Sequence, residues 1–266
     1  MSTKRNIVLV TFHLEAYGET TVNYNRDVEI FPVLQAMLNK IYNSCPYKSP
    51  TDMGVNMAGN AIFDDEVCRE ASKQEIVRRY YATCCAQRQS MAEASEVYRL
   101  EMLMNSMGIS PAIRKCVDPA LANAERTGGP AVAIELPDGR IVTGKTSSLL
   151  GASSAALLNA LKVLGSIDDG THLMSPSIIE PIQKLKTGHM GNHNPRLHTD
   201  EILIALSICA VTDPTAACAL SQLEGLRGAE AHSTVILSDV DAGVFKKLGV
   251  NLTCEPVYQT KKLYHK

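Results

Sequence analysis

The stretch that most constrains this chain is an apolar segment at residues 131–162, where the hydrophobic period changes from two to 3.6 residues. Its first part has two short apolar runs on either side of Pro137-Asp138-Gly139. This tripeptide is typical of a turn, because Pro presets φ and Gly accepts a positive φ. The runs therefore predict a β-hairpin. After Lys145 the apolar residues recur at helical spacing as far as Gly165, which predicts a buried helix.

Helices and strands alternate over the remaining C-terminal part of the chain. We expect strands at 172–174, 232–237 and 251–257, and helices at 176–186, 201–211, 214–227 and 242–248. Strands that alternate with helices predict a sheet covered on both faces. The fold class predicted for this region is therefore α/β.

Residues 64–129 show a helical pattern throughout. Two long helices are expected at 64–89 and 91–107, and a third begins at Ser110-Pro111 and is expected to kink or restart at Pro119. Short connections between three helices predict a small antiparallel helical subdomain. We expect three parts in all: a polar leading segment with one helix opening at Phe31-Pro32 (1–63), the helical subdomain (64–129) and an α/β sandwich domain (130–266).

Composition argues against several classes of function. A net charge of -2 argues against a general nucleic-acid binder, and no apolar run reaches the roughly 20 residues that cross a bilayer. The apolar run Ile7–Val10 is too short for a signal peptide, and the 8 cysteines include no C-x-x-C spacing. We therefore expect a cytoplasmic protein with reduced thiols, no membrane association and no metal site.

Polar and charged side chains are dense between Thr11 and Pro32, where hydrophobic periodicity is poor. Such a segment either lines a site, faces another domain or is simply solvated surface. If it lines a site, the candidate catalytic residues are His13, Glu15, Arg26 and Asp27, and the candidate ligand contacts are Tyr17 and Asn25.

A second polar cluster precedes the helix expected at 201–211. Arg196, His198 and Asp200 are candidates to bind a phosphate or carboxylate there, because free N–H groups and the helix dipole favour anions at a helix start. The alternative is a capping Asp200 beside ordinary loop histidines. A metal site would require His189, His193 and His198 to converge, and we assign none.

Residues 139–146 match the phosphate-loop pattern G-x-x-x-x-G-K-[ST] letter for letter. However, the first Gly lies in the expected hairpin turn and residues 141–143 form a strand, so the required strand–loop–helix context is missing. We expect the end of a hairpin here. Lys145 and Thr146 are kept as candidate ligand contacts, because a helix start follows them.

Several long segments resemble one bacterial family, the family of domain of unknown function 1846, also called uncharacterised protein family 0371. They are FHLEAYGETTVNYNRDVEIFP, YKSPTDMGVNMAG, ELPDGRIVTGKTSSLLGASSAALLNALK, NPRLHTDEILIAL, EAHSTVILS and NLTCEPVYQTKKLYHK, and the resemblance covers about residues 12–266. Members are cytosolic and nearly twice this length. The resemblance implies that this chain is the C-terminal half of a larger protein, truncated ahead of a polar segment that faced a partner domain.

The C-terminal part also resembles the cytidine-deaminase-like fold in its layer order. This likeness implies a three-layer α/β sandwich, preceded by the small helical subdomain. Deaminase chemistry needs His or Cys with Glu at the helix start and a later C-x-x-C to hold zinc. Here the helix start reads Gly151-Ala152-Ser153-Ser154-Ala155, so the likeness implies the fold without the zinc chemistry.

Three functions are open at this level. The first is a binding site for a phosphorylated or nucleotide-like small molecule, indicated by the helix starts near Lys145 and Arg196. The second is an enzyme with a cleft between this half and an N-terminal half. The third is an oligomerisation module without chemistry, in which the apolar helix at 201–211 packs against a second copy in a homo-oligomer. The sequence assigns no cofactor to any of them.

Overall fold

The computed structural model describes residues 24–45, 47 and 65–259. The chain divides into two compact units. One unit combines the chain up to Tyr80 with Ala94–Ile113, and the other combines Tyr81–Glu93 with the chain from Arg114 onward. The three-part division at residues 63 and 129 stays a prediction.

The described part of the first unit is helical. It contains α2 (Tyr24–Tyr42), the first part of α4 (Asp65–Arg88), α5 (Ala94–Met107) and the short 3-10 helix η1 (Pro111–Ile113). The predicted start of the first helix at Phe31 is wrong, because α2 already begins at Tyr24 and holds Pro32 in its interior. Polar residues such as Glu and Arg sustain a helix without an apolar stripe, so hydrophobic periodicity misses this part.

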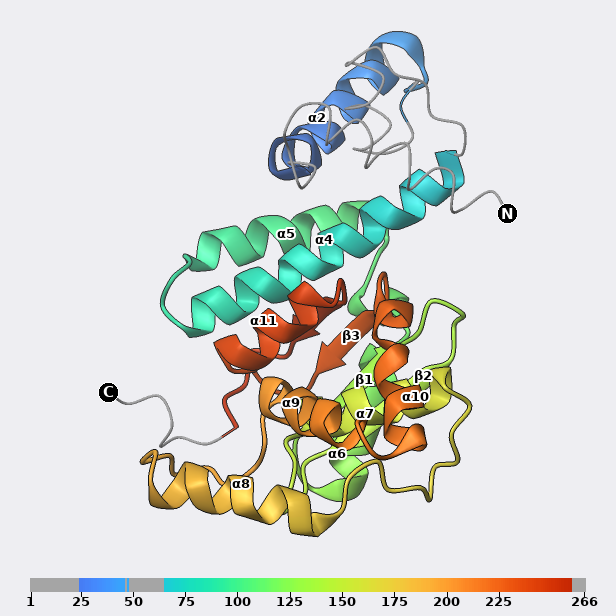
Figure 1. Cartoon of the computed structure of the whole chain (residues 1–266). Helices are drawn as coiled ribbons and strands as arrows, with labels where there is room; N and C mark the ends of the chain where they lie inside the picture. The colour runs from blue at the N-terminus through green and yellow to red at the C-terminus, as the bar shows by residue number, and fades with distance from the viewer. Residues whose placement is uncertain (1–23, 46, 48–64, 260–266) are drawn as a thin grey trace, which may run out of the picture. The chain divides into compact units, whose positions relative to one another are not determined.

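The second unit is built on a mixed sheet, which in the described residues has four strands in the order β2-β1-β3-β4 (Figure 1). β1 (Ala131–Glu135) pairs antiparallel with β2 (Ile141–Lys145) and with β3 (Glu230–Ser233). β3 pairs in parallel with β4 (Asn251–Cys254). The predicted hairpin is confirmed, and Gly139 takes a φ of 87° in its turn.

Helices surround this sheet in the second unit (Figure 1). They are α6 (Val117–Thr127), α7 (Ala152–Leu164), α8 (Pro176–Gly188), α9 (Thr199–Cys209), α10 (Pro214–Ser221), the 3-10 helix η2 (Leu223–Leu226) and α11 (Asp239–Lys247). Val132 and Ile134 of β1 belong to the main core cluster, which includes α7, whereas Ala133 clusters with Cys116 and Ala120 next to and on α6. None of the described helices is both long and apolar enough to cross a membrane.

Several expected elements differ from the structure: the strands expected at 232–237 and 251–257 are β3 (230–233) and β4 (251–254), and the helix expected at 214–227 is divided into α10 and η2. Residues 172–174 form no strand; instead Leu173 and Met174 are buried in the core as anchors of a loop. The third helix is interrupted before Pro119, since η1 ends at Ile113 and α6 starts at Val117. Pro119 therefore lies in the first turn of α6. N–H groups in this turn have no acceptor within the helix, so a proline here removes no helical hydrogen bond.

The phosphate-loop match is the end of the hairpin, as its context predicted. Gly144 lies within β2, and a Cβ atom added there would be 2.1 Å from the backbone N of Ala156 and 2.8 Å from the backbone O of Ala152. Glycine is therefore needed because strand β2 and helix α7 approach each other closely. This contact fixes the position of α7, whose first turn is part of the site described below.

The close approach predicts the effect of two matched substitutions. Gly144→Ala should lower the free energy of unfolding by about 2 kcal/mol or more, because the new methyl group overlaps backbone atoms that cannot move aside easily. Gly243→Ala is the control: it lies in α11, and a Cβ there meets no described atom within 4 Å. That control should raise the free energy of unfolding by about 0.5–1 kcal/mol. Urea denaturation measures both, and equal effects would contradict the packing.

Candidate functional site

A buried carboxylate joins the first turns of α9 and α11. Asp241, which is 5% exposed, accepts hydrogen bonds at Oδ1 from the backbone N–H and the hydroxyl of Thr199, at 2.9 and 3.0 Å. Its Oδ2 accepts from the hydroxyl of Ser238 at 2.9 Å and lies 2.9 Å from Nδ1 of His198. Each carboxylate oxygen thus has two partners, and the side chain is held in a single position.

His198 is the N-cap residue of α9, and Asp241 orients its ring. The backbone N–H of His198 donates to Oε2 of Glu201 at 2.8 Å, while the ring keeps 30% of its exposure. Because Nδ1 faces Asp241, Nε2 is the ring atom left for a ligand. No residue in the described part of the chain hydrogen-bonds to it.

The pair shifts both ionisation equilibria. The hydrogen bond to Asp241 raises the pKa of His198, although burial of the ring acts in the opposite direction. Burial alone would raise the pKa of Asp241, but the hydrogen bonds from His198 and from the Thr199 backbone outweigh it and lower that pKa. The pair therefore favours an imidazolium beside a carboxylate. A histidine whose pKa is shifted by a fixed carboxylate is typical of ligand-binding and catalytic sites.

Two basic side chains lie around this pair. Lys186 is 3% exposed and donates to Oε2 of Glu201 at 2.7 Å and to the carbonyl of Arg196 at 2.8 Å. The Arg196 side chain donates from Nε to the carbonyl of Ser147 at 2.7 Å. Glu201 thus neutralises Lys186, whereas the half-buried Arg196 side chain bonds, among the described residues, only to a neutral carbonyl and keeps its positive charge available.

The segment before His198 is attached to the first turn of α7. The carbonyl of Leu197 accepts hydrogen bonds from the Gly151 N–H at 3.3 Å and from the Ser154 hydroxyl at 2.9 Å. The Leu197 N–H donates to the Leu149 carbonyl at 3.0 Å. The N-termini of α7, α9 and α11 therefore lie close together around the segment 197–199.

The structure brings together the predicted ligand contacts that precede α9. Arg196, His198 and Asp200 all lie at the start of this helix, and Arg196 bonds to Ser147 in the loop that follows Lys145 and Thr146. The alternative, in which Asp200 is the helix cap, is wrong, because His198 holds the N-cap position. Within the described part of the chain, Asp200 accepts only the Glu201 N–H, at 2.8 Å. Lys145 is exposed, and the Thr146 N–H donates to the Pro130 carbonyl.

The other predicted residues belong to the polar leading segment. His13, Glu15 and Tyr17 lie outside the described residues. Asn25, Arg26 and Asp27 lie on α2, but their side chains are outside the described part as well. Their roles as catalytic or ligand-binding residues stay predictions.

Asp241, Ser238 and Lys186 are site residues that sequence reasoning missed. The pattern Ser238-Asp239-Val240-Asp241 has the S-x-x-D spacing of a helix start, and Ser238 indeed accepts the Asp241 N–H. That signal could have located the start of α11. It does not reveal that Asp241 bonds to a histidine 43 residues earlier in the chain.

A second histidine network lies inside the sheet. His232 is 0% exposed, with Nδ1 2.9 Å from the Thr253 hydroxyl and Nε2 3.2 Å from Oε1 of Glu255. The bond to His232 lowers the pKa of Glu255 against the effect of burial. Both ring nitrogens are occupied, so this network supports the sheet rather than offering an atom to a ligand. In the described ranges, no three His, Cys, Asp or Glu side chains are grouped to hold a metal.

The geometry defines an α/β protein with an oriented histidine–aspartate pair at converging helix starts. The chain belongs to the DUF1846 family: the family's N-terminal domain matches residues 3–108 and its C-terminal domain matches residues 112–264. This confirms the resemblance found in the sequence.

Similar proteins occur in streptococci. A UPF0371 protein of Streptococcus thermophilus (strain CNRZ 1066) is 56% identical over 255 residues, which cover 96% of this chain and 52% of that protein. A UPF0371 protein of Streptococcus pneumoniae (strain JJA) is 55% identical with the same coverage, 96% and 52%. The chain therefore spans about half the length of these relatives.

The His198–Asp241 pair predicts a pH dependence of stability. The raised pKa of His198 gives a stabilisation that is complete below about pH 6.5, the ordinary value, and is lost as pH rises through the folded-state pKa. The lowered pKa of Asp241 gives a second stabilisation, which is present at pH values above the ordinary pKa of aspartate. This stabilisation is lost as pH falls through the folded-state pKa of Asp241.

Comparing the wild type with His198→Gln isolates the histidine contribution. The difference in free energy of unfolding between them, measured by urea denaturation, should be largest between about pH 5 and 6.5 and should shrink at higher pH. A difference that is constant from pH 5 to about 8 would show that the imidazolium form does not stabilise the fold.

Proposed function

We propose that this chain binds a small molecule through a phosphate or similar anionic group at His198. The His198–Asp241 pair carries the proposal: Asp241 holds Nδ1, favours the imidazolium, and leaves Nε2 as a charged donor. A phosphate dianion gains a charge-assisted hydrogen bond from such a group. A phosphorylated or nucleotide-like ligand is the specific class that we infer.

The charges around His198 are largely paired. Asp241 is balanced by His198, and Glu201 is balanced by Lys186. Arg196 contributes a further positive charge, and α9 adds the partial positive charge of its first turn. Asp200 in the same turn carries a negative charge, so the side-chain charges sum to about zero, and the preference for an anion rests on the donor at Nε2 of His198 and on the helix start.

Ligand binding is tested by the change in melting temperature with a panel of sugar phosphates and nucleoside monophosphates. At least one should stabilise the wild-type chain, and His198→Asn should remove that shift. The Asn amide still reaches Asp241 as a donor but has no counterpart of Nε2. His193→Asn, in the exposed loop before α9, is the matched control and should keep the shift. The proposal fails if no phosphorylated compound acts, or if both variants respond like the wild type.

Acid–base catalysis is a second candidate function at the same site. The observation that favours it is the orientation of His198, whose Nδ1 faces a fixed carboxylate while Nε2 is left for a reacting group. The proposed cleft between this chain and the remaining half of its longer relatives, with His13, Glu15, Arg26 and Asp27 as catalytic residues, belongs to this candidate. A turnover assay on whichever ligand is found would decide it, since a pure binding protein returns the ligand unchanged.

Three further properties are part of the proposal. A three-layer, deaminase-like sandwich is supported by the alternation in β1, where Ala133 packs towards α6 and its neighbours towards α7.

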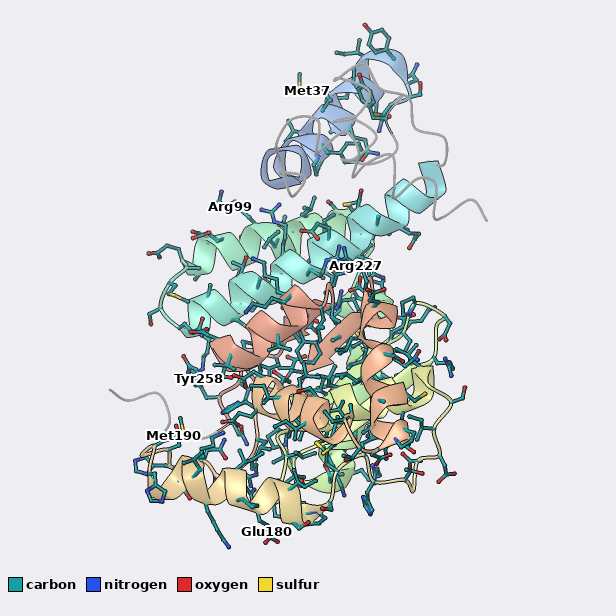
Figure 2. The ribbon with its side chains drawn as sticks, in the orientation of Figure 1. Met37, Arg99, Glu180, Met190, Arg227 and Tyr258 are labelled. Atoms are coloured by element: carbon teal, nitrogen blue, oxygen red, sulfur yellow. The ribbon has the colours of Figure 1, made fainter. Side chains whose placement is uncertain are left out.

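A homo-oligomer is supported by exposed apolar residues on α9 (Ile204, Ile208) and just beyond it (Val211), and by Met190 after α8 (Figure 2). Sedimentation as a monomer at micromolar concentration would refute the oligomer. We also retain a cytoplasmic location, which fractionation of cells would test.

A further inference from the structure

The first turn of α7 has no side-chain cap. Its N-cap residue is Gly151, which has no side chain to accept the N–H groups of the turn. The first helical hydrogen bond is donated by Ala155 to the Gly151 carbonyl, so the N–H groups of Ala152, Ser153 and Ser154 precede the helical ladder. These groups carry the positive end of the helix dipole.

Ser153 is a largely buried serine at this helix start. The residue is only 3% exposed, and none of the described residues forms a hydrogen bond with its hydroxyl. Its Oγ lies 3.8 Å from the position of a Cβ built on Gly151, so it points back towards the N-cap. The neighbouring Ser154 differs, because its hydroxyl donates to Leu197 at 2.9 Å. Ser153 Oγ is not among the fully buried atoms without a partner in the described residues, so it keeps some contact with solvent, and a ligand atom can replace water as its partner.

Described atoms leave the Cα of Gly151 uncrowded. A Cβ on Gly151 would meet only Leu197 O at 3.7 Å and Ser153 Oγ at 3.8 Å among described atoms within 4 Å. The φ and ψ of Gly151, -68° and 161°, suit any residue, so neither backbone strain nor crowding requires glycine here. Close approach of a ligand to the backbone is a use of glycine that this geometry fits.

We propose that the first turn of α7 binds an oxyanion, a phosphate or a carboxylate group, through its free N–H groups and the hydroxyl of Ser153. Gly151 leaves the approach open, and Leu197 anchors the opposite side of the turn through Gly151 and Ser154. This subsite is distinct from the Nε2 site at His198, and it stands if the ligand proposed there is wrong.

Isothermal titration of the 266-residue chain with inorganic phosphate tests the subsite. Ser153→Ala should weaken phosphate binding about tenfold, the usual effect of removing one hydrogen bond to a charged group. Gly151→Asp should abolish it, because the new carboxylate would itself cap the turn. Ser207→Ala is the control and should bind like the wild type, since its exposed hydroxyl bonds to the Ile204 carbonyl on α9.

His198→Asn separates this inference from the function proposed above. Phosphate binding that is weakened about tenfold in Ser153→Ala and unchanged in His198→Asn supports the subsite. Binding that is lost in His198→Asn and unchanged in Ser153→Ala overturns it and leaves the His198 site standing. Absence of any phosphate binding at millimolar concentration also overturns it. If Ser153→Ala fails to fold, Gly151→Asp decides the question, and a folded Gly151→Asp protein with unchanged phosphate affinity contradicts the subsite.

Discussion

Burial of the Asp241 carboxylate is the constraint on which the site depends. An ionised carboxylate removed from water is strongly unfavourable unless donors surround it, and here His198, Thr199 and Ser238 supply four of them. These donors come from the starts of two helices, α9 and α11. Satisfying one charge therefore fixes both helix starts and also fixes the imidazole that projects from one of them.

Close packing between the hairpin and α7 is the second constraint on the site, because it positions the first turn of α7. Gly144 lets β2 lie against α7, and Leu197 then ties the first turn of α7 to the segment that carries His198. Among the described residues, Nε2 of His198 and the hydroxyl of Ser153 have no hydrogen-bond partner at this junction, and they belong to the two proposed binding sites.

Local sequence signals predicted the local structure well. The hairpin at β1–β2, helix α7 and the extent of α4 follow from turn residues and hydrophobic period, which act over a few positions. The start of α2 was missed because its first turns lack an apolar stripe. The pattern before α9 indicated an anion site with Arg196 and His198, but not the carboxylate that orients the ring. Asp241 lies 43 residues away from His198, and no local rule relates such residues.

The central claim is that Asp241 holds His198 as an imidazolium with Nε2 free for a ligand. The most direct measurement is the pKa of His198, from NMR titration of its ring signals in the wild type and in Asp241→Asn. The account predicts a wild-type pKa above the ordinary value of histidine and a clearly lower pKa in the variant, whose amide carries no charge. The same pKa in both proteins would contradict it.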